Sequence, residues 1–132
     1  MRRNRMQAFS RRLVAEKRLS VDDLIWPLFV IEGEQKTEII DAMPGVARHS
    51  IDRLLEQAQH AVDRGIPAIA IFPSIDAALK DPVGSLADDG DNLVCRAVQA
   101  VKSRYPELGV ICDVALDPFT DHGHDGVIHI DQ

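Results

Sequence analysis

The sequence predicts an α/β fold in which parallel strands are joined by helices, and three observations support this prediction. Short apolar runs bounded by Gly and Pro alternate with longer segments in which apolar residues recur at helical spacing. The segments follow the order strand, helix, strand, helix, strand. The connections into the strands are short, whereas those that follow the strands are long and polar. Two such crossovers are typical of the start of either a doubly wound sheet or a (β/α)₈ barrel.

Composition limits the class of protein. With 132 residues, of which 45% are apolar, the chain can bury one modest core, as a single domain or as part of a larger one. A net charge of −6 argues against a nucleic-acid partner. The apolar runs 24–31 and 66–72 are far shorter than the roughly 20 residues of a membrane helix, and no signal-peptide pattern precedes them. Cys95 and Cys112 lack disulfide or zinc spacing and are expected to be buried thiols, so a cytoplasmic protein is predicted.

Residues 1–23 are predicted to form an N-terminal arm. The first 18 residues are rich in arginine, with weak helical periodicity, and Ser20 with Asp23 fits a capping box at a short helical turn. The arm has too few apolar side chains to form a core of its own. We therefore expect it to pack, extended or helical, against another protein chain, in preference to RNA or an anionic membrane.

The first half of the body is predicted as a strand, a loop, a helix and a second strand. Residues 25–31 are aromatic and β-branched without alternation, as in a strand buried on both faces. Residues 32–49 contain Gly and Pro among charged residues and are expected to be a long loop. A helical face runs through 51–64, with Ser50 as N-cap and Gly65 as C-cap. The apolar run 66–72 then suits a buried parallel strand.

The second half repeats this pattern. A loop is expected over 74–91, a helix over 92–104 and a third strand over 109–116. No glycine fingerprint follows any strand, which disfavours a doubly wound nucleotide-binding domain. In a doubly wound sheet and in a (β/α)₈ barrel alike, the functional residues lie at the carboxyl ends of the strands. The loops that follow the strands are therefore the expected place of function.

Carboxylates and imidazoles gather where the third strand ends. Strand periodicity would place Asp113 and Asp117 on one face, and Asp121, His122 and Asp125 follow. Oxygen-rich ligand sets favour hard cations such as Mg²⁺, and the histidine side chains extend the choice to Mn²⁺ or Zn²⁺. Loops full of Asp and Gly are also common turn chemistry. The spacing alone leaves both interpretations open.

Over most of its length the chain resembles the porphobilinogen synthase (5-aminolevulinate dehydratase) family, of the aspartate-rich, non-zinc type. Five segments in the same order carry this resemblance: Asp23 to Val30 with Glu32-Gly33, Met43-Pro44-Gly45-Val46 with Arg48, Gly65 to Pro73, Lys80-Asp81 with Gly84, and the motif Asp-x-Ala-Leu-Asp-x-Phe-x-x-x-Gly-His-Asp-Gly at 113–126.

The resemblance implies a fold and an activity. Members of the family condense two molecules of 5-aminolevulinate into porphobilinogen, in tetrapyrrole (heme) biosynthesis. They do so on a (β/α)₈ TIM barrel whose N-terminal arm embraces a neighbouring subunit, in homo-oligomers that are usually octameric. By this resemblance residues 24–132 are the first part of an incomplete barrel, with about three of its strands.

The resemblance also implies roles for four positions. The three zinc-binding cysteines of other members correspond here to Ala115, Asp117 and Asp125, which exclude a thiolate zinc site. Mg²⁺ held by Asp117 and Asp125 is expected instead. Asp113 matches the family aspartate near the substrate amino group, which implies an orienting or proton-handling role.

The two lysines that form Schiff bases in the family lie on later strands and are absent from this chain. None of its lysines ends an apolar strand, and all are expected to be solvated: Lys17, Lys36, Lys80 and Lys102. The chain alone is therefore predicted to be inactive. The alternative hypothesis is a noncatalytic module that binds a divalent cation through Asp117 and Asp125, or that binds full-length subunits through its basic arm.

Overall fold

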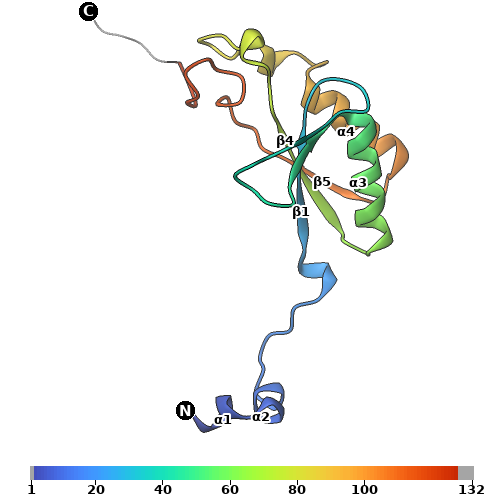
Figure 1. Cartoon of the computed structure of the whole chain (residues 1–132), viewed down its shortest axis with the longest axis vertical. Helices are drawn as coiled ribbons and strands as arrows, with labels where there is room; N and C mark the ends of the chain where they lie inside the picture. Colours follow the sequence, from blue (N-terminus) through green and yellow to red (C-terminus); the bar gives the residue numbers. More distant parts are fainter. Residues whose placement is uncertain (1, 128–132) are drawn as a thin grey trace, which may run out of the picture.

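The computed structural model describes residues 2–127, in which one sheet carries two helices on one face and a separate N-terminal segment extends from one end (Figure 1). The strands are β1 Ile25–Val30, β2 Thr37–Ile39, β3 Ala47–His49, β4 Ala68–Pro73 and β5 Gly109–Cys112. The α-helices are α1 Arg3–Met6, α2 Ala8–Leu13, α3 Ile51–Asp63 and α4 Leu93–Arg104. Three 3₁₀ turns are η1 Val21–Asp23, η2 Ala77–Leu79 and η3 Ser85–Asp88.

The sheet confirms the predicted α/β organisation. Its order is β2-β3-β1-β4-β5, and β1, β4 and β5 run parallel. Both crossover helices, α3 and α4, lie on the same face of the sheet (Figure 1). The core fills the space between these layers, with Leu54 of α3, Val101 of α4 and Ile69 of β4 all fully buried. Helices on one face of neighbouring parallel strands are the arrangement from which a barrel is built.

The three predicted strands are confirmed as β1, β4 and β5, but the prediction that residues 32–49 form a loop was wrong. Within this segment β2 and β3 form an antiparallel hairpin, and β3 pairs in parallel with the end of β1, where Val30 lies opposite His49. Strands of three residues give no readable periodicity in the sequence. A buried side chain fixes the hairpin: the Ser50 hydroxyl accepts from the Lys36 backbone N–H at 2.9 Å and donates to the Asp52 carboxylate.

The predicted crossover helices are confirmed, with small differences at their ends. Ser50 is the N-cap of α3, and the C-cap is Arg64 instead of the predicted Gly65. Gly65 is the next residue and adopts a φ of 70°, a left-handed conformation that suits glycine after a helix. The N-cap of α4 is Asn92, whose side-chain oxygen accepts from the Cys95 N–H at 3.0 Å.

The third parallel strand is shorter than predicted. β5 ends at Cys112, and the chain then turns so that the carbonyl of Leu116 accepts from the N–H groups of Phe119 and Thr120. Apolar residues continue to 116, which is why the sequence suggested a longer strand. β5 is the edge strand of this sheet, and its pairing with β4 stops where Cys112 lies opposite Ile71, although β4 continues to Pro73.

The N-terminal segment extends away from the sheet, with α1 and α2 at the far end of the molecule (Figure 1). The capping box between Ser20 and Asp23 is present at η1, as predicted. Met6, Phe9 and Leu13 expose 74%, 66% and 81% of their surface. Between residues 2 and 127 no helix has the length and apolar character needed to cross a membrane.

Candidate functional site

The candidate site lies at the carboxyl ends of β4 and β5. Two segments leave the sheet there, residues 74–91, here named the β4 loop, and residues 113–126, here named the aspartate-rich loop. Phe72 near the end of β4 lies opposite Phe29 of β1, and the two ring centroids are 5.8 Å apart. Asp113 follows Cys112, the partner of Ile71, and therefore stands at the level of Phe72. An exposed carboxylate thus follows β5 at the level of an aromatic pair, at the carboxyl end of the sheet.

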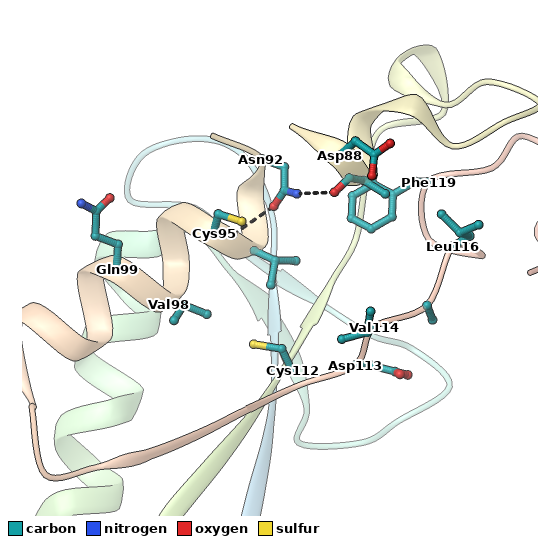
Figure 2. A pocket seen from close by; sticks show the side chains of 13 residues that line it. Asp88, Asn92, Cys95, Val98, Gln99, Cys112, Asp113, Val114, Leu116 and Phe119 are labelled. Atoms are coloured by element: carbon teal, nitrogen blue, oxygen red, sulfur yellow. Dashed lines mark hydrogen bonds between the residues drawn. The ribbon is translucent and has the colours of Figure 1, made fainter. Parts of the chain in front are cut away.

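Asp113 is exposed, and it lies after β5, not within it. The prediction that strand alternation places it on one face with Asp117 is therefore wrong, because the strand has ended and residues 117–119 form a turn. Figure 2 shows the Cys112 side chain pointing toward α4 and the Asp113 carboxylate pointing to the opposite side. This direction is the one that would face the interior of a closed barrel.

The aspartate-rich loop brings Asp117 and Asp125 together. One carboxylate oxygen of Asp125, Oδ1, accepts from the backbone N–H of Leu116 at 2.8 Å and from that of Asp117 at 3.2 Å. Both aspartates are exposed. Asp125 is therefore a turn-closing residue as well as a carboxylate beside Asp117. Of the two interpretations that the spacing left open, the turn role of Asp125 is confirmed, and the metal-ligand role stays a prediction.

The donor set suits a loosely held hard cation better than a closed metal cage. Among residues 2–127 no three His, Cys, Asp or Glu side chains come close enough to form a ligand cluster. Mg²⁺ is commonly bound through one or two carboxylates and keeps several of its waters. Asp117 and Asp125 fit that kind of site, while the backbone bonds of Asp125 occupy one of its oxygens.

The two loops are joined to one another through Asp81, to which the sequence assigned no role. Its backbone pairs with the aspartate-rich loop: the Asp81 N–H donates to the Phe119 carbonyl, and the Asp121 N–H donates to the Asp81 carbonyl. Its carboxylate accepts from the Ser85 hydroxyl and from two backbone N–H groups. These bonds, that from Ser85 first, lower the pKa of the Asp81 carboxyl. Asp-Pro-x-Gly-Ser at 81–85 is the turn signal that could have indicated this.

A groove of about 580 Å³ lies between α4 and the chain that leaves β5 (Figure 2). Apolar side chains line most of it, among them Val98, Leu116 and Phe119. Cys95 and Cys112 also line it; Cys95 is exposed, which corrects the prediction of two buried thiols. Burial raises the pKa of the half-buried Cys112 thiol. Asp113 lines the groove as well, next to Cys112.

None of the four lysines lies in a strand. Lys17, Lys36 and Lys102 are exposed, as predicted, whereas Lys80 is half-buried. Lys36 pairs with Glu38 at 2.7 Å, and Lys102 donates to the Leu108 carbonyl at 3.0 Å. The chain therefore places no lysine at the end of an apolar strand.

Comparisons with known proteins agree over nearly the whole chain. The family model of delta-aminolevulinic acid dehydratase matches residues 1–132. The dehydratase of Bradyrhizobium diazoefficiens is 55% identical over 127 residues, which are 96% of this chain and 36% of that protein. That of Chlamydia pneumoniae is 44% identical over 96% of this chain and 38% of its own length. The chain thus spans somewhat more than a third of these relatives.

A solved structure shows the same arrangement. The delta-aminolevulinic acid dehydratase (porphobilinogen synthase) of Toxoplasma gondii, in complex with the reaction product porphobilinogen, superimposes with a TM-score of 0.89 at 39% identity. The match covers 97% of this chain and 36% of that one.

Parallel strands with helices on one face, and a carboxylate loop at their carboxyl ends, define the N-terminal part of a (β/α)₈ barrel enzyme. The family model, which matches residues 1–132, identifies the family of enzyme. The chain belongs to the delta-aminolevulinic acid dehydratase family, also known as porphobilinogen synthase.

Proposed function

We propose that the complete protein condenses two molecules of 5-aminolevulinate into porphobilinogen with release of two water molecules. The observation that carries this proposal is the similarity to the Toxoplasma gondii enzyme, which holds the reaction product porphobilinogen and matches 97% of this chain. The resemblance implies that the lysines that form imines with substrate lie on later strands of the barrel. This chain would then contribute part of the lining of the active site. The rest of the barrel would contribute the lysines that form the covalent intermediates.

Among the residues that this chain contributes, Asp113 is the proposed catalytic residue. It is exposed at the mouth of the sheet and stands at the level of the Phe29 and Phe72 pair. Condensation requires a free amine on one substrate, and a carboxylate beside it can orient the ammonium group and accept its proton.

Substitution of Asp113 by Asn in the complete protein tests this role. The amide keeps the size of the side chain but removes the charge and the proton acceptor, so porphobilinogen formation should fall about 100-fold or more. Asp88→Asn is the matched control, because Asp88 is also exposed at the rim of the groove and has no proposed role. Equal activity of Asp113→Asn and the wild type, measured as initial rates of porphobilinogen release, would exclude the role.

We also propose that Asp117 and Asp125 hold Mg²⁺ mainly through water. The support is that Asp125 Oδ1 accepts from the Asp117 N–H at 3.2 Å, which keeps both carboxylates in one exposed turn. When bound, the cation would supply positive charge near the substrate. With Ala115 as the third corresponding position, no thiolate is available for zinc.

The N-terminal arm supports a further proposal, that the complete protein is a homo-oligomer. Met6, Phe9 and Leu13 expose most of their surface on α1 and α2, far from the sheet (Figure 1). Apolar side chains gathered on an extended segment are typical of an interaction site. The same segment would serve the alternative of a noncatalytic subunit-binding module.

A further inference from the structure

His122 connects the two loops of the candidate site, and neither the proposed chemistry nor the metal site uses it. Its Nε2 lies 3.2 Å from the carbonyl oxygen of Pro82 in the β4 loop. Its Nδ1 lies 3.2 Å from the backbone nitrogen of His124, two residues further along the aspartate-rich loop. The two imidazole rings stack, with centroids 5.9 Å apart and planes inclined by 19°.

These two contacts determine the proton position on His122. A backbone N–H can only donate, so Nδ1 must offer its lone pair to His124. A proline carbonyl can only accept, so Nε2 must carry the proton and donate to Pro82. The neutral Nε2–H tautomer satisfies both partners at once, and no other form of the ring does.

From His122 the hydrogen bonds continue to the carboxylate beside Asp117. The carbonyl of His124, whose N–H is held by His122, accepts from the Thr120 hydroxyl at 3.0 Å. Thr120 is 1% exposed, and its N–H donates to the Leu116 carbonyl, so it is fixed in the interior of the loop. Asp125 follows His124 directly and closes the turn at Leu116.

We propose that His122 is a positioning residue that ties the aspartate-rich loop to the β4 loop and thereby sets the place of the Asp125 carboxylate. Its importance for catalysis rests on the proposed function, whereas its effect on the loop does not. The backbone bridge between Asp81 and Thr120 already joins the two loops at one point. The bond from His122 to Pro82 adds a second point of attachment, at the residue that follows Asp81.

Two substitutions separate the two bonds of His122. The Asn side-chain oxygen lies near the position of Nδ1 and keeps the acceptor for His124, but it removes the donor to Pro82. The Gln side-chain nitrogen lies near the position of Nε2 and keeps the donor to Pro82. We expect His122→Asn to accelerate backbone hydrogen exchange at Leu116 and Asp117 about 2- to 10-fold, as for the loss of one hydrogen bond, and His122→Gln to stay closer to the wild type.

Hydrogen–deuterium exchange by mass spectrometry on the full chain measures this in the segment 113–121, with α3 as the internal reference. His60→Asn on α3 is the control, because His60 is exposed and lies outside both loops. Equal exchange in the Asn and Gln variants, or wild-type exchange in both, overturns the proposal. Loss of protection throughout the chain in both variants overturns it as well, since His122 would then be a residue of general stability.

A double substitution tests whether His122 acts through Asp125. In an Asp125→Asn background the additional effect of His122→Asn should be smaller than in the wild type, because residues that act along one path are not additive. If the two substitutions change the exchange rate by factors that simply multiply in the double variant, His122 acts independently of Asp125. These measurements need no substrate, so they remain informative if the complete protein proves to catalyse another reaction.

Discussion

Asp125 shows how one side chain serves both local structure and chemistry. Its Oδ1 accepts from two backbone N–H groups, those of Leu116 and Asp117, and so closes the aspartate-rich loop. Hydrogen bonds to a charged acceptor contribute about 1.5–3 kcal/mol when shielded, and less at an exposed residue such as this one. Any cation bound here therefore shares Asp125 with the backbone, which favours weak binding through water.

Titration calorimetry of the protein with Mg²⁺ checks this property. Asp117→Asn should weaken binding about tenfold, or about 1.4 kcal/mol, because it removes one of two charges from the site. Asp121→Asn is the control, since Asp121 is exposed in the same loop but uses its backbone, not its carboxylate, to contact Asp81. Tight zinc that survives dialysis and is required for turnover of the complete protein would contradict the proposal.

At the scale of elements, the approach of β5 to β4 depends on the absence of a side chain. Gly109 lies opposite Ala68, and a Cβ built on it would be 3.0 Å from the Ala68 Cβ and 3.0 Å from the Pro67 carbonyl oxygen. That carbonyl accepts from the Gly109 N–H at 2.9 Å, so the two backbones cannot separate without loss of the bond. This contact allows the first residue of β5 to lie close against the start of β4.

Gly109→Ala should consequently destabilise the chain by about 1–3 kcal/mol, the usual cost of overpacking. Urea unfolding measures the change. Gly90→Ala is the matched control, because nothing lies within 4 Å of a Cβ at Gly90. If both variants unfold at the same urea concentration as the wild type, the strands β4 and β5 leave room for a side chain at position 109, which would contradict the prediction.

The arm gives a second prediction at this scale. Phe9→Ser together with Leu13→Ser should lower the mass of the assembled complete protein in light scattering, because both side chains are 66% or more exposed and suit burial against another chain. Arg5→Gln with Arg12→Gln is the control for charge and should leave the assembly intact. Unchanged mass in the serine variant would remove the support for arm-mediated assembly.

At the scale of the whole molecule, the sheet has one covered and one open face. The helices α3 and α4 bury one face, while Ile25 and Ile111 on the other are 55% and 46% exposed. In a (β/α)₈ barrel that second face lines the interior, which needs eight strands to close. The chain spans 36% of the Bradyrhizobium diazoefficiens relative, so in the complete protein the remaining strands would cover these residues.

This leads to a prediction for the chain alone. Incubation with 5-aminolevulinate and borohydride should leave its mass unchanged, because imine formation needs an activated amine and no lysine here ends an apolar strand. Three of the four lysines are exposed. The complete protein is the positive control. A specific adduct, most informatively on the half-buried Lys80, would show a reactive amine within these 132 residues.

The sequence by itself determined the class of fold, the two crossover helices and the family. Helical spacing of apolar residues is a local signal, so α3 and α4 could be predicted within a residue or two. Apolar runs ended by Gly or Pro identified β1 and β4 for the same reason. Asp117 and Asp125 were identified as a pair through the family motif, and their spacing alone could not separate a ligand set from a turn.

Only the tertiary structure decided the contacts between segments distant in the sequence. The β2–β3 hairpin depends on pairing with the end of β1 and on the buried Ser50 hydroxyl, which no three-residue pattern encodes. β5 ends at Cys112 although apolar residues continue to Leu116, because a strand requires pairing with its neighbour as well as apolar content. The bond from His122 to Pro82 spans 40 residues. Such contacts arise when the carboxyl ends of parallel strands meet at one edge, a property of the folded sheet that no single segment carries.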